Sequence, residues 1–349
     1  MYGGPVRSLD LFAVQAHVTP RTYASPAAFR AAMLDLADRC ARARRGDAAV
    51  AVFPENVGTF LAVTPLGARG ARLRSPELAM ALAAGRRPLA FARALATSRG
   101  PATAALLTVA EEVRGVWEET FREAAVRTGM TIVGGSALLP DGEDGAVYNL
   151  SATWGPDGAR LGRTRKCNLV PALETDLGLA SGAPAATPIV DTPAGPLATL
   201  ICYDGFRLPH TTREPGWEPV GPALGGRARI VAQPAANPWP WDGPWVHRAK
   251  GSAMLRREQW AAEGLEGLLP TLEGVRWAIT AHLTGEVLGQ RFEGRSRVYA
   301  RRPDGAVAVL AEAPHIGGAS AIVHAAVEDV REASAESVGS RGPRAGGGA

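Results

Sequence analysis

The sequence predicts an α/β protein in which helices cover mixed β-sheets. Three observations support this fold class. Apolar runs with strand character recur along the chain, helical stretches separate them in the first half, and hairpin-like pairs follow in the second half. Strands that alternate with helices are typical of parallel sheets, and hairpins add antiparallel strands. With 349 residues, of which 46% are hydrophobic, the chain can bury a large core without disulfides.

The first half of the chain alternates between predicted strands and helices. Residues 9–16 and 48–53 are apolar runs that we expect to form buried strands. Between them, residues 26–45 carry alanine, leucine and arginine at helical spacing. Residues 109–128 place apolar side chains along one helical face, and a third strand is predicted at 130–139.

The second half is predicted to be richer in strands. A Gly-Pro-Asp-Gly turn at residues 155–158 joins two extended runs into a hairpin. A helix is expected to begin near Glu273 and to lead into one of the later strands. The extended runs of this half cover residues 147–154, 159–166, 196–202, 228–233, 298–302, 306–310 and 319–327.

The organisation of the chain favours one domain over residues 1–330. Two stretches, 58–108 and 242–269, interrupt the regular pattern and are interpreted as loop insertions. A further loop is expected at 209–226. The tail at 331–349 is rich in glycine, serine and arginine, so we expect it to be disordered.

Composition and charge narrow the function classes. The three cysteines form no CxxC pair, which favours a reducing, cytoplasmic setting. No apolar run approaches the roughly 20 residues that span a bilayer, and the start of the chain lacks the pattern of a signal peptide. The net charge of +4 is spread along the chain without a basic stripe, so nucleic acid is not an expected partner. The six histidines show no zinc spacing, and neither a GxSxG nor a P-loop motif occurs; we expect no metal and no cofactor.

Three predicted strands end at a residue with reactive chemistry. Glu55, Lys166 and Cys202 follow three such runs, and ligands of open α/β sheets gather beyond the carboxyl ends of strands. Taken singly, each residue has a plainer explanation: a solvated loop carboxylate, a surface lysine and an inert core thiol. Lysine is nevertheless rare here, because only two of the 38 basic residues are lysines. An ammonium is a compact charge that fits against a reacting centre where a guanidinium would not.

These three residue types are sufficient for amide hydrolysis. A free thiol has a pKa near 8.5, so a neighbouring carboxylate is needed to take its proton as general base. Attack of the sulfur on an amide carbon places negative charge on the carbonyl oxygen, which an ammonium and a backbone N–H can stabilise. The resulting thioester is then hydrolysed by water, and neither histidine nor metal is required.

The flanks of these residues resemble the nitrilase superfamily of carbon–nitrogen hydrolases. The signatures are VAVFPEN around Glu55, GPDGARLGRTRKCNLVP around Lys166 and LATLICYDGF around Cys202, in that order. EGVRWAITAHLTG, GQRFEGRSRV and RRPDGAVAVL resemble the carboxyl-terminal half of the family. The likeness runs from about residue 9 to residue 330, so the predicted domain is a carbon–nitrogen hydrolase domain.

The resemblance implies a fold and a set of roles. The fold is an αββα sandwich, a nitrilase-like four-layer fold, assembled as a homodimer or a higher homo-oligomer. Glu55 would be the general base, Lys166 the oxyanion stabiliser and Cys202 the nucleophile. A second glutamate often lies eight positions beyond the lysine, and Glu174 stands there. It would orient the lysine; its plainer explanation is an exposed loop acid. The N–H of Tyr203 would be the second oxyanion donor.

Departures from the family pattern bear on the substrate. Tyr203-Asp204 follows the cysteine where nitrilases commonly carry Trp-Glu, which favours an amide or carbamoyl substrate over a nitrile. The Pro-Glu that is frequent slightly later is Pro209-His210 here. Asn237 and the tryptophans near it, Trp239 and Trp241, are candidates to line the pocket, with plain packing as the alternative. Arg207 could pair with a substrate carboxylate, although a surface ion pair is its default interpretation.

The resulting hypothesis is an amidase-like hydrolase of a non-peptide C–N bond that releases ammonia or an amine. Two alternatives use the same thioester or the same nucleophile: a soluble N-acyltransferase, which passes the acyl group to an amine, and a nitrile hydrolase. A catalytically silent binding protein of the same fold is a third alternative, against which the intact Glu55, Lys166 and Cys202 argue.

Overall fold

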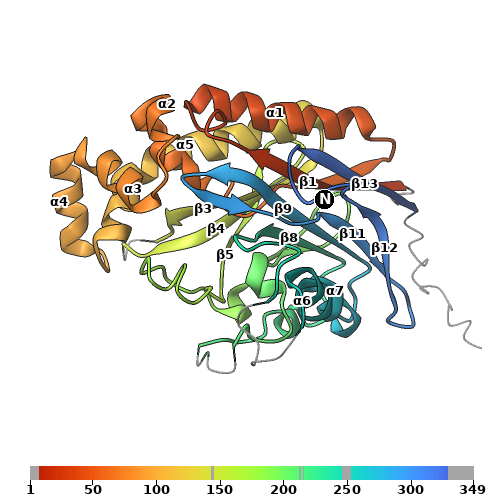
Figure 1. Ribbon diagram of the computed structural model, residues 1–349. Coiled ribbons are helices and arrows are strands. Elements are labelled where there is room, and N and C mark those ends of the chain that lie inside the picture. Colours follow the sequence, from red (N-terminus) through yellow and green to blue (C-terminus); the bar gives the residue numbers. More distant parts are fainter. Residues whose placement is uncertain (1–7, 143–144, 212–213, 215, 246–252, 329–349) are drawn as a thin grey trace, which may run out of the picture.

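The structure is a computed structural model that describes residues 8–142, 145–211, 214, 216–245 and 253–328. Its strands form two sheets that share β1, with the order β5-β4-β3-β2-β1-β9-β8-β7-β6 (Figure 1). The first sheet contains β1 (Ser8–Val18), β2 (Ala48–Val52), β3 (Thr131–Pro140), β4 (Val147–Trp154), β5 (Arg160–Arg165) and β13 (Ala321–Glu328). The second contains β6 (Ile189–Val190), β7 (Leu197–Thr199), β8 (Ile230–Ala236), β9 (Trp277–Val287), β10 (Gln290–Phe292), β11 (Arg297–Arg301) and β12 (Val307–Glu312).

Strand β1 joins the two sheets because its two ends pair differently. Its first part pairs with β2 in parallel and with β13 in antiparallel register. Its last residues, from Ala16 to Val18, pair in parallel with β9 of the second sheet. The backbone hydrogen bonds therefore continue from one sheet into the other.

Alternating side chains of β1 face two different cores. Leu9, Leu11 and Ala13 contribute to the core between the sheets, together with residues of β8, β9 and β11. Phe12 and Val14 belong to the core beneath the helices on the outer face. Successive side chains of a strand point to opposite faces, so an apolar run with no polar alternation is the sequence of a strand covered on both sides.

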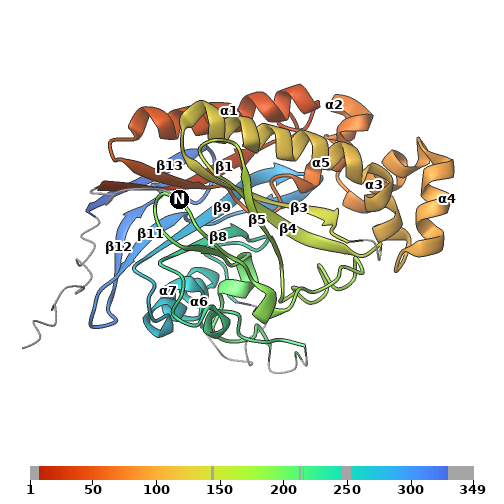
Figure 2. The same ribbon diagram turned by 180° about the vertical axis from the view of Figure 1, so that it is seen from behind.

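Helices cover both outer faces, which confirms the predicted αββα sandwich. Helices α1 (Pro26–Ala43) and α5 (Pro101–Thr128) lie side by side across the first sheet, seen from behind in Figure 2. Helices α6 (Arg256–Glu263) and α7 (Leu265–Leu268) lie against the second sheet on the opposite side. No helix of the described residues is both long enough and apolar enough to cross a membrane.

Two expected elements differ from the structure. The stretch 58–108, interpreted as a loop insertion, is largely helical, with a 3-10 segment (Thr59–Leu66), α2 (Gly67–Gly70), α3 (Pro76–Gly85), α4 (Pro88–Thr97) and the first turns of α5. Its many alanines favour helix, and the Ser75 side chain caps α3 by accepting from the Leu78 N–H. The helix expected near Glu273 is wrong. Gly274 adopts a left-handed φ of 79° in a turn that passes close to Gly226, and β9 begins directly afterwards.

The short strands β6 and β10 were not predicted, whereas the other strands and α1 lie within a few residues of their predicted positions. The stretch 242–269 contains α6 and α7. The tail at 331–349, expected to be disordered, lies outside the described residues. The single-domain boundary at residue 330 stays a prediction.

Candidate active site

Side chains from the segments that follow β2 and β5 meet in one buried cluster. Lys166 Nζ donates to Glu55 Oε1 at 2.7 Å and to Glu174 Oε2 at 2.6 Å. All three side chains are buried, with the Lys166 side chain only 1% exposed. The backbone N–H of Val170 also donates to Glu174 Oε2, at 2.9 Å. Glu174 is therefore part of the cluster rather than an exposed loop acid.

Asn149 is a member of this cluster that sequence reasoning missed. It lies on β4, and its Nδ2 donates to Glu55 Oε1 at 2.9 Å and to Glu174 Oε1 at 2.7 Å. The Lys166 N–H donates to the Asn149 backbone carbonyl at 2.9 Å, so the two residues are neighbours across the hairpin. The available signal was a polar amide within a strand of otherwise small and apolar residues. One ammonium and one amide thus hold two carboxylates side by side.

The Glu55 loop is held close to β3. Gly135, with a φ of 65°, leaves room for the Pro54 carbonyl; a Cβ at this glycine would lie 2.0 Å from that oxygen. The Asn56 N–H donates to Ser136 Oγ at 2.9 Å. Both contacts occur where the β3–β4 register shifts, and the irregularity lets the loop pack against the strand. The Glu55 carboxylate is thereby directed into the cluster.

Cys202 begins a short 3-10 helix (Cys202–Gly205) beyond β7, with a φ of 48°. Residues other than glycine rarely adopt this left-handed conformation, which persists where its surroundings hold it. Gln233 Nε2 donates to the Cys202 carbonyl at 2.8 Å, and Thr280 Oγ1 donates to Gln233 Oε1 at 2.7 Å. A Cβ at Gly205 would lie 2.3 Å from Gln233 Nε2, so only glycine leaves room for this contact.

The nucleophile candidate contacts the carboxylate cluster. The Cys202 thiol lies close enough to Glu55 for each group to shift the pKa of the other, and Cys202 Sγ donates to the Ala236 carbonyl oxygen at 3.5 Å. Burial raises the pKa of the Cys202 thiol well above its usual value, and the charge of Glu55 raises it further. The resting sulfur is therefore a protonated thiol.

Burial also raises the pKa of Glu55, against the opposing charge of Lys166. Burial alone would lower the pKa of Lys166, but the charges of Glu174 and Glu55 raise it well above its usual value. Lys166 is therefore a permanent cation, and Glu55 is a stronger base than a solvated carboxylate. A base with a raised pKa beside a protonated thiol is the arrangement that proton abstraction requires.

Asp204 joins the lysine loop to the cysteine loop. Its carboxylate accepts from the backbone N–H groups of Cys167 at 3.1 Å and Asn168 at 2.7 Å. Burial raises the pKa of Asp204 to about 7, although the N–H of Asn168 opposes the shift. Sequence reasoning used this residue only as a departure from a family motif. Its contacts set the position of Lys166 relative to Cys202.

The four predicted substrate contacts occupy different surroundings. The Tyr203 side chain is directed away from the cluster, because its hydroxyl donates to Glu214 Oε2 at 2.6 Å and its ring stacks on His210. Asn237 Nδ2 donates to the carbonyl oxygens of Trp239 at 2.7 Å and Glu293 at 3.0 Å, so this amide shapes the loop after β8.

Two of the tryptophans expected near the pocket pack with the cysteine. Trp241 belongs to the same buried cluster as Cys202, and the half-buried Trp239 packs against that cluster. Arg207 is exposed, and its Nε donates to the Ala262 carbonyl oxygen at 2.8 Å, near the end of α6. The default interpretation of Arg207, a surface contact, fits this position.

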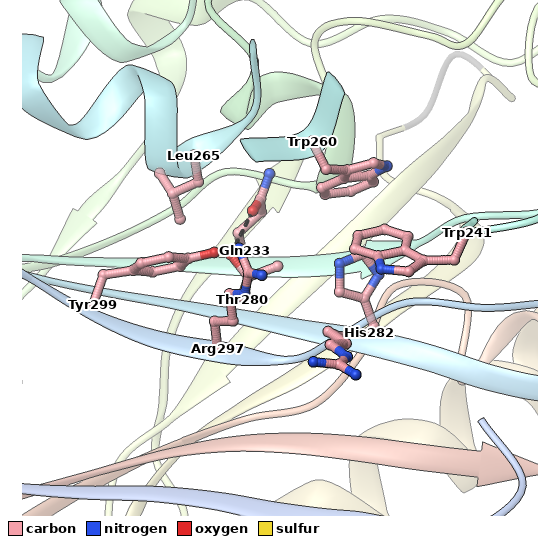
Figure 3. A pocket seen from close by; sticks show the side chains of 9 residues that line it. Gln233, Trp241, Trp260, Leu265, Thr280, His282, Arg297 and Tyr299 are labelled. Carbon is pink, nitrogen blue, oxygen red and sulfur yellow. Dashed lines mark hydrogen bonds between the residues drawn. The ribbon is translucent and has the colours of Figure 1, made fainter. Parts of the chain in front are cut away.

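A small cavity lies beside Gln233 and Thr280, the residues that hold the Cys202 carbonyl, between the second sheet and helices α6 and α7 (Figure 3). Gln233 and Thr280 line its middle, and Trp260 and His282 crowd one end. Its volume of about 10 Å³ is enough for about one water molecule and excludes a substrate. Trp260 Nε1 and His282 Nδ1 are buried polar atoms without a hydrogen-bond partner among the described residues.

Within the part of the chain that the structure describes, no cluster of three or more His, Cys, Asp or Glu side chains could hold a metal ion. The reactive groups of the site are a thiol, an ammonium and two carboxylates. The sequence profile of the carbon-nitrogen hydrolase family matches residues 13–212, which include all four of them.

The chain belongs to the carbon-nitrogen hydrolase family.

Solved structures support the same fold for this hydrolase. The amidase from Nesterenkonia sp. superposes with a TM-score of 0.57 at 17% identity, over 94% of this chain and 92% of that one. A double mutant of the amidase from Nesterenkonia sp. AN1 in complex with acrylamide has a TM-score of 0.57 at 16% identity, over 93% and 92% of the two chains. A mutant of that amidase in complex with butyramide gives 0.56 at 17% identity, over 93% and 92%. No curated protein matches the sequence.

Proposed function

We propose that this hydrolase cleaves a non-peptide C–N bond of an amide or N-carbamoyl compound through a thioester at Cys202. The observation that carries the proposal is the contact of the Cys202 thiol with Glu55, whose carboxylate also touches the Lys166 ammonium. A nucleophile, a base and a cation thus meet in one buried cluster. The similar amidase from Nesterenkonia sp. AN1 has been solved with acrylamide and with butyramide, which supports short amides as the first substrates to test.

The acylation step follows from these contacts. Glu55 takes the thiol proton while Cys202 Sγ forms a bond to the substrate carbon, and the π electrons of the carbonyl move onto its oxygen. Lys166 Nζ and the backbone N–H of Tyr203 donate to this oxyanion, and each such donor typically contributes about 3 kcal/mol to the transition state. Collapse of the intermediate breaks the C–N bond, and the departing amine takes the proton from Glu55.

Deacylation uses the same groups in reverse order. Glu55 removes a proton from water, the water oxygen attacks the thioester carbon, and the C–S bond breaks. The sulfur leaves as a thiolate and takes the proton from Glu55, so thiol and carboxylate return to their starting states. Glu174 and Asn149 keep Lys166 and Glu55 in position, because both carboxylates accept from the same ammonium and the same amide.

The experiment is a panel of short amides, N-carbamoyl amino acids and nitriles, each scored for ammonia release. Wild-type enzyme should release ammonia from an amide or carbamoyl compound, and Cys202→Ala should lose all turnover. Cys40→Ala is the matched control, because Cys40 is an equally buried thiol on α1 that packs in the helix-covered core. Full activity of Cys202→Ala would refute the proposal.

The same panel separates the alternatives. A hydrolase releases free acid whether or not an amine acceptor such as hydroxylamine is added, whereas an acyltransferase needs the acceptor. Turnover confined to nitriles would favour the nitrile hydrolase. Assembly into a homodimer or higher homo-oligomer and a cytoplasmic location stay predictions, which the molar mass in solution and the location of a tagged chain would test.

A further inference from the structure

Helices α2, α3 and α4 form an arm that the mechanism above does not use. Figure 1 shows α3 and α4 extending beyond the sheets at one end of the molecule. Residues 67–99, here called the helical arm, contain seven arginines and one glutamate, a net charge of +6. The whole chain has a net charge of +4, so the remainder, without the +6 of the arm, carries −2. The excess positive charge therefore lies in the arm and is not spread along the chain, contrary to the interpretation of the sequence.

Most of this charge is not neutralised within the described part of the protein. Arg74 pairs with Glu286 at 3.9 Å. Arg87 pairs with Glu112. Among the described residues, no carboxylate forms an ion pair with the other five arginines, all of them exposed: Arg69, Arg72, Arg86, Arg93 and Arg99. The arm therefore presents a positive field to any partner that approaches it.

The arm also exposes leucines beside these arginines. Nine large hydrophobic side chains of the described residues are exposed, and four of them are leucines of the arm: Leu78, Leu82, Leu89 and Leu95. Leu78 and Leu82 lie one turn apart on α3, and Leu89 on α4 is 76% exposed. Helix α4 has no buried residue, although it is mostly alanine and leucine. Large apolar side chains that gather on one part of a surface mark an interaction site, whereas scattered ones do not.

Cationic and apolar side chains share the same surfaces of the arm. On α4, Arg93 follows Leu89 by four positions, so both lie on one side of the helix. A groove of about 520 Å³ between α2 and α3 is lined by both kinds of side chain, among them Leu66, Leu73, Leu82, Arg69 and Arg86. An arginine can lay its alkyl stem on apolar surface while its charged head stays at a polar boundary. This combination matches an anionic membrane surface, where acyl chains take up leucines and headgroups pair with guanidinium groups.

The inner side of the arm fixes it to the domain. Ala79 and Ala83 of α3 are buried in the core beneath the helices of the first sheet. Met80 packs against that core and against a second apolar cluster, formed by the start of α5 and the loop that carries Glu174. The leucines are therefore exposed because they occupy the outer face of a firmly packed arm.

We propose that the helical arm binds the surface of a membrane that contains anionic lipids. This inference goes beyond the proposed hydrolysis and does not depend on it. The arm lies along the surface, with its leucines among the acyl chains and its arginines at the headgroup phosphates. A second copy of the arm is a poorer partner, because it would bring the same charge of +6 to the contact. A soluble polyanion such as a nucleic acid would pair with the arginines but would leave the leucines in water.

The test measures cosedimentation of the full chain with lipid vesicles at physiological ionic strength. Wild-type protein should bind vesicles of equal parts phosphatidylcholine and phosphatidylglycerol roughly tenfold or more tightly than vesicles of phosphatidylcholine alone. The double variant Arg69→Gln, Arg93→Gln should weaken binding to the anionic vesicles by roughly 30-fold, at about fivefold for each charge. The double variant Leu82→Gln, Leu89→Gln should weaken it by roughly tenfold at unchanged charge. All four side chains are exposed, so neither variant opens the core.

The matched control is the double variant Arg302→Gln, Leu310→Gln, which should bind like wild-type protein. Both residues are exposed, and they belong to the β11–β12 hairpin at the other end of the molecule (Figure 1).

Three results would overturn the inference. Wild-type protein could bind neither kind of vesicle, or both kinds equally. The leucine variant could bind the anionic vesicles as tightly as wild-type protein, which would mean that charge alone makes the contact. The molar mass of free wild-type protein in solution could fall in the leucine variant, which would mean that a second copy covers these leucines.

Discussion

Asn149→Leu removes the amide that holds the two carboxylates of the cluster. The side chain is buried, and its Nδ2 donates to Glu55 and to Glu174. This orientation leaves Oδ1 buried without a hydrogen-bond partner among the described residues, which costs about 1–3 kcal/mol. The chain accepts this cost at a position where an apolar residue of similar size would fit the strand. We therefore expect the amide to serve catalysis rather than folding.

The magnitude follows from the hydrogen bonds that are lost. A hydrogen bond to a charged group contributes about 1.5–3 kcal/mol, and the bond to Glu55 favours its ionised form. Its removal should raise the pKa of Glu55 further, by about one unit for about 1.4 kcal/mol. The acid limb of the profile of kcat/KM against pH should move to higher pH by about one unit. At neutral pH, kcat/KM should fall by roughly 10- to 100-fold.

The assay measures ammonia release from the best amide of the panel between about pH 5 and pH 9, the range in which the raised carboxyl pKa should act. Ser151→Ala is the matched control, because Ser151 is a buried residue two positions further along β4 whose hydroxyl has no partner among the described residues. Its profile should match that of wild-type enzyme. If folded Asn149→Leu keeps the wild-type acid limb and the wild-type kcat/KM, the proposed role of the amide is wrong.

Three further predictions test other parts of the site. Lys166→Arg should lose most turnover, because a guanidinium cannot replace the compact ammonium between two carboxylates; near-normal ammonia release would contradict this. Gln233→Met removes the hydrogen bond to the Cys202 carbonyl and should lower kcat about tenfold with little change in KM. An equal change in kcat and KM, or no change in either, would argue against a role of Gln233 in positioning Cys202. Burial lowers the pKa of His282 to about 3, from 6.5 when unfolded, so its contribution to stability is present above pH 6.5 and is lost as the pH falls. Between pH 7 and pH 5 the free energy of unfolding should therefore drop by about 2 kcal/mol more in wild-type enzyme than in His282→Gln, and equal drops measured by urea unfolding would refute this.

Local sequence patterns were sufficient to predict most of the strands and the three reactive residues, Glu55, Lys166 and Cys202. An apolar run such as β1 predicts a buried strand, because its composition requires cover on both faces. Glu55, Lys166 and Cys202 were found because each stands directly after such a run within a family-like signature. The helices in 58–108 were missed because their alanines mark no clear apolar face; α4, for example, has no buried residue.

The polar residues that hold these three residues in place could be identified only from the tertiary structure. Asn149 and Gln233 lie in apolar strands, where the sequence does not distinguish a functional amide from one that is merely buried. The sequence also does not show that Arg207 is exposed and Arg256 is enclosed, because this difference depends on which segments pack around each arginine. Lys166 and Glu55 are 111 positions apart, so their contact depends on the order of strands in the sheet. Local composition determines which segments must be buried, whereas the partners of a buried polar group are set by which distant segments pack around it.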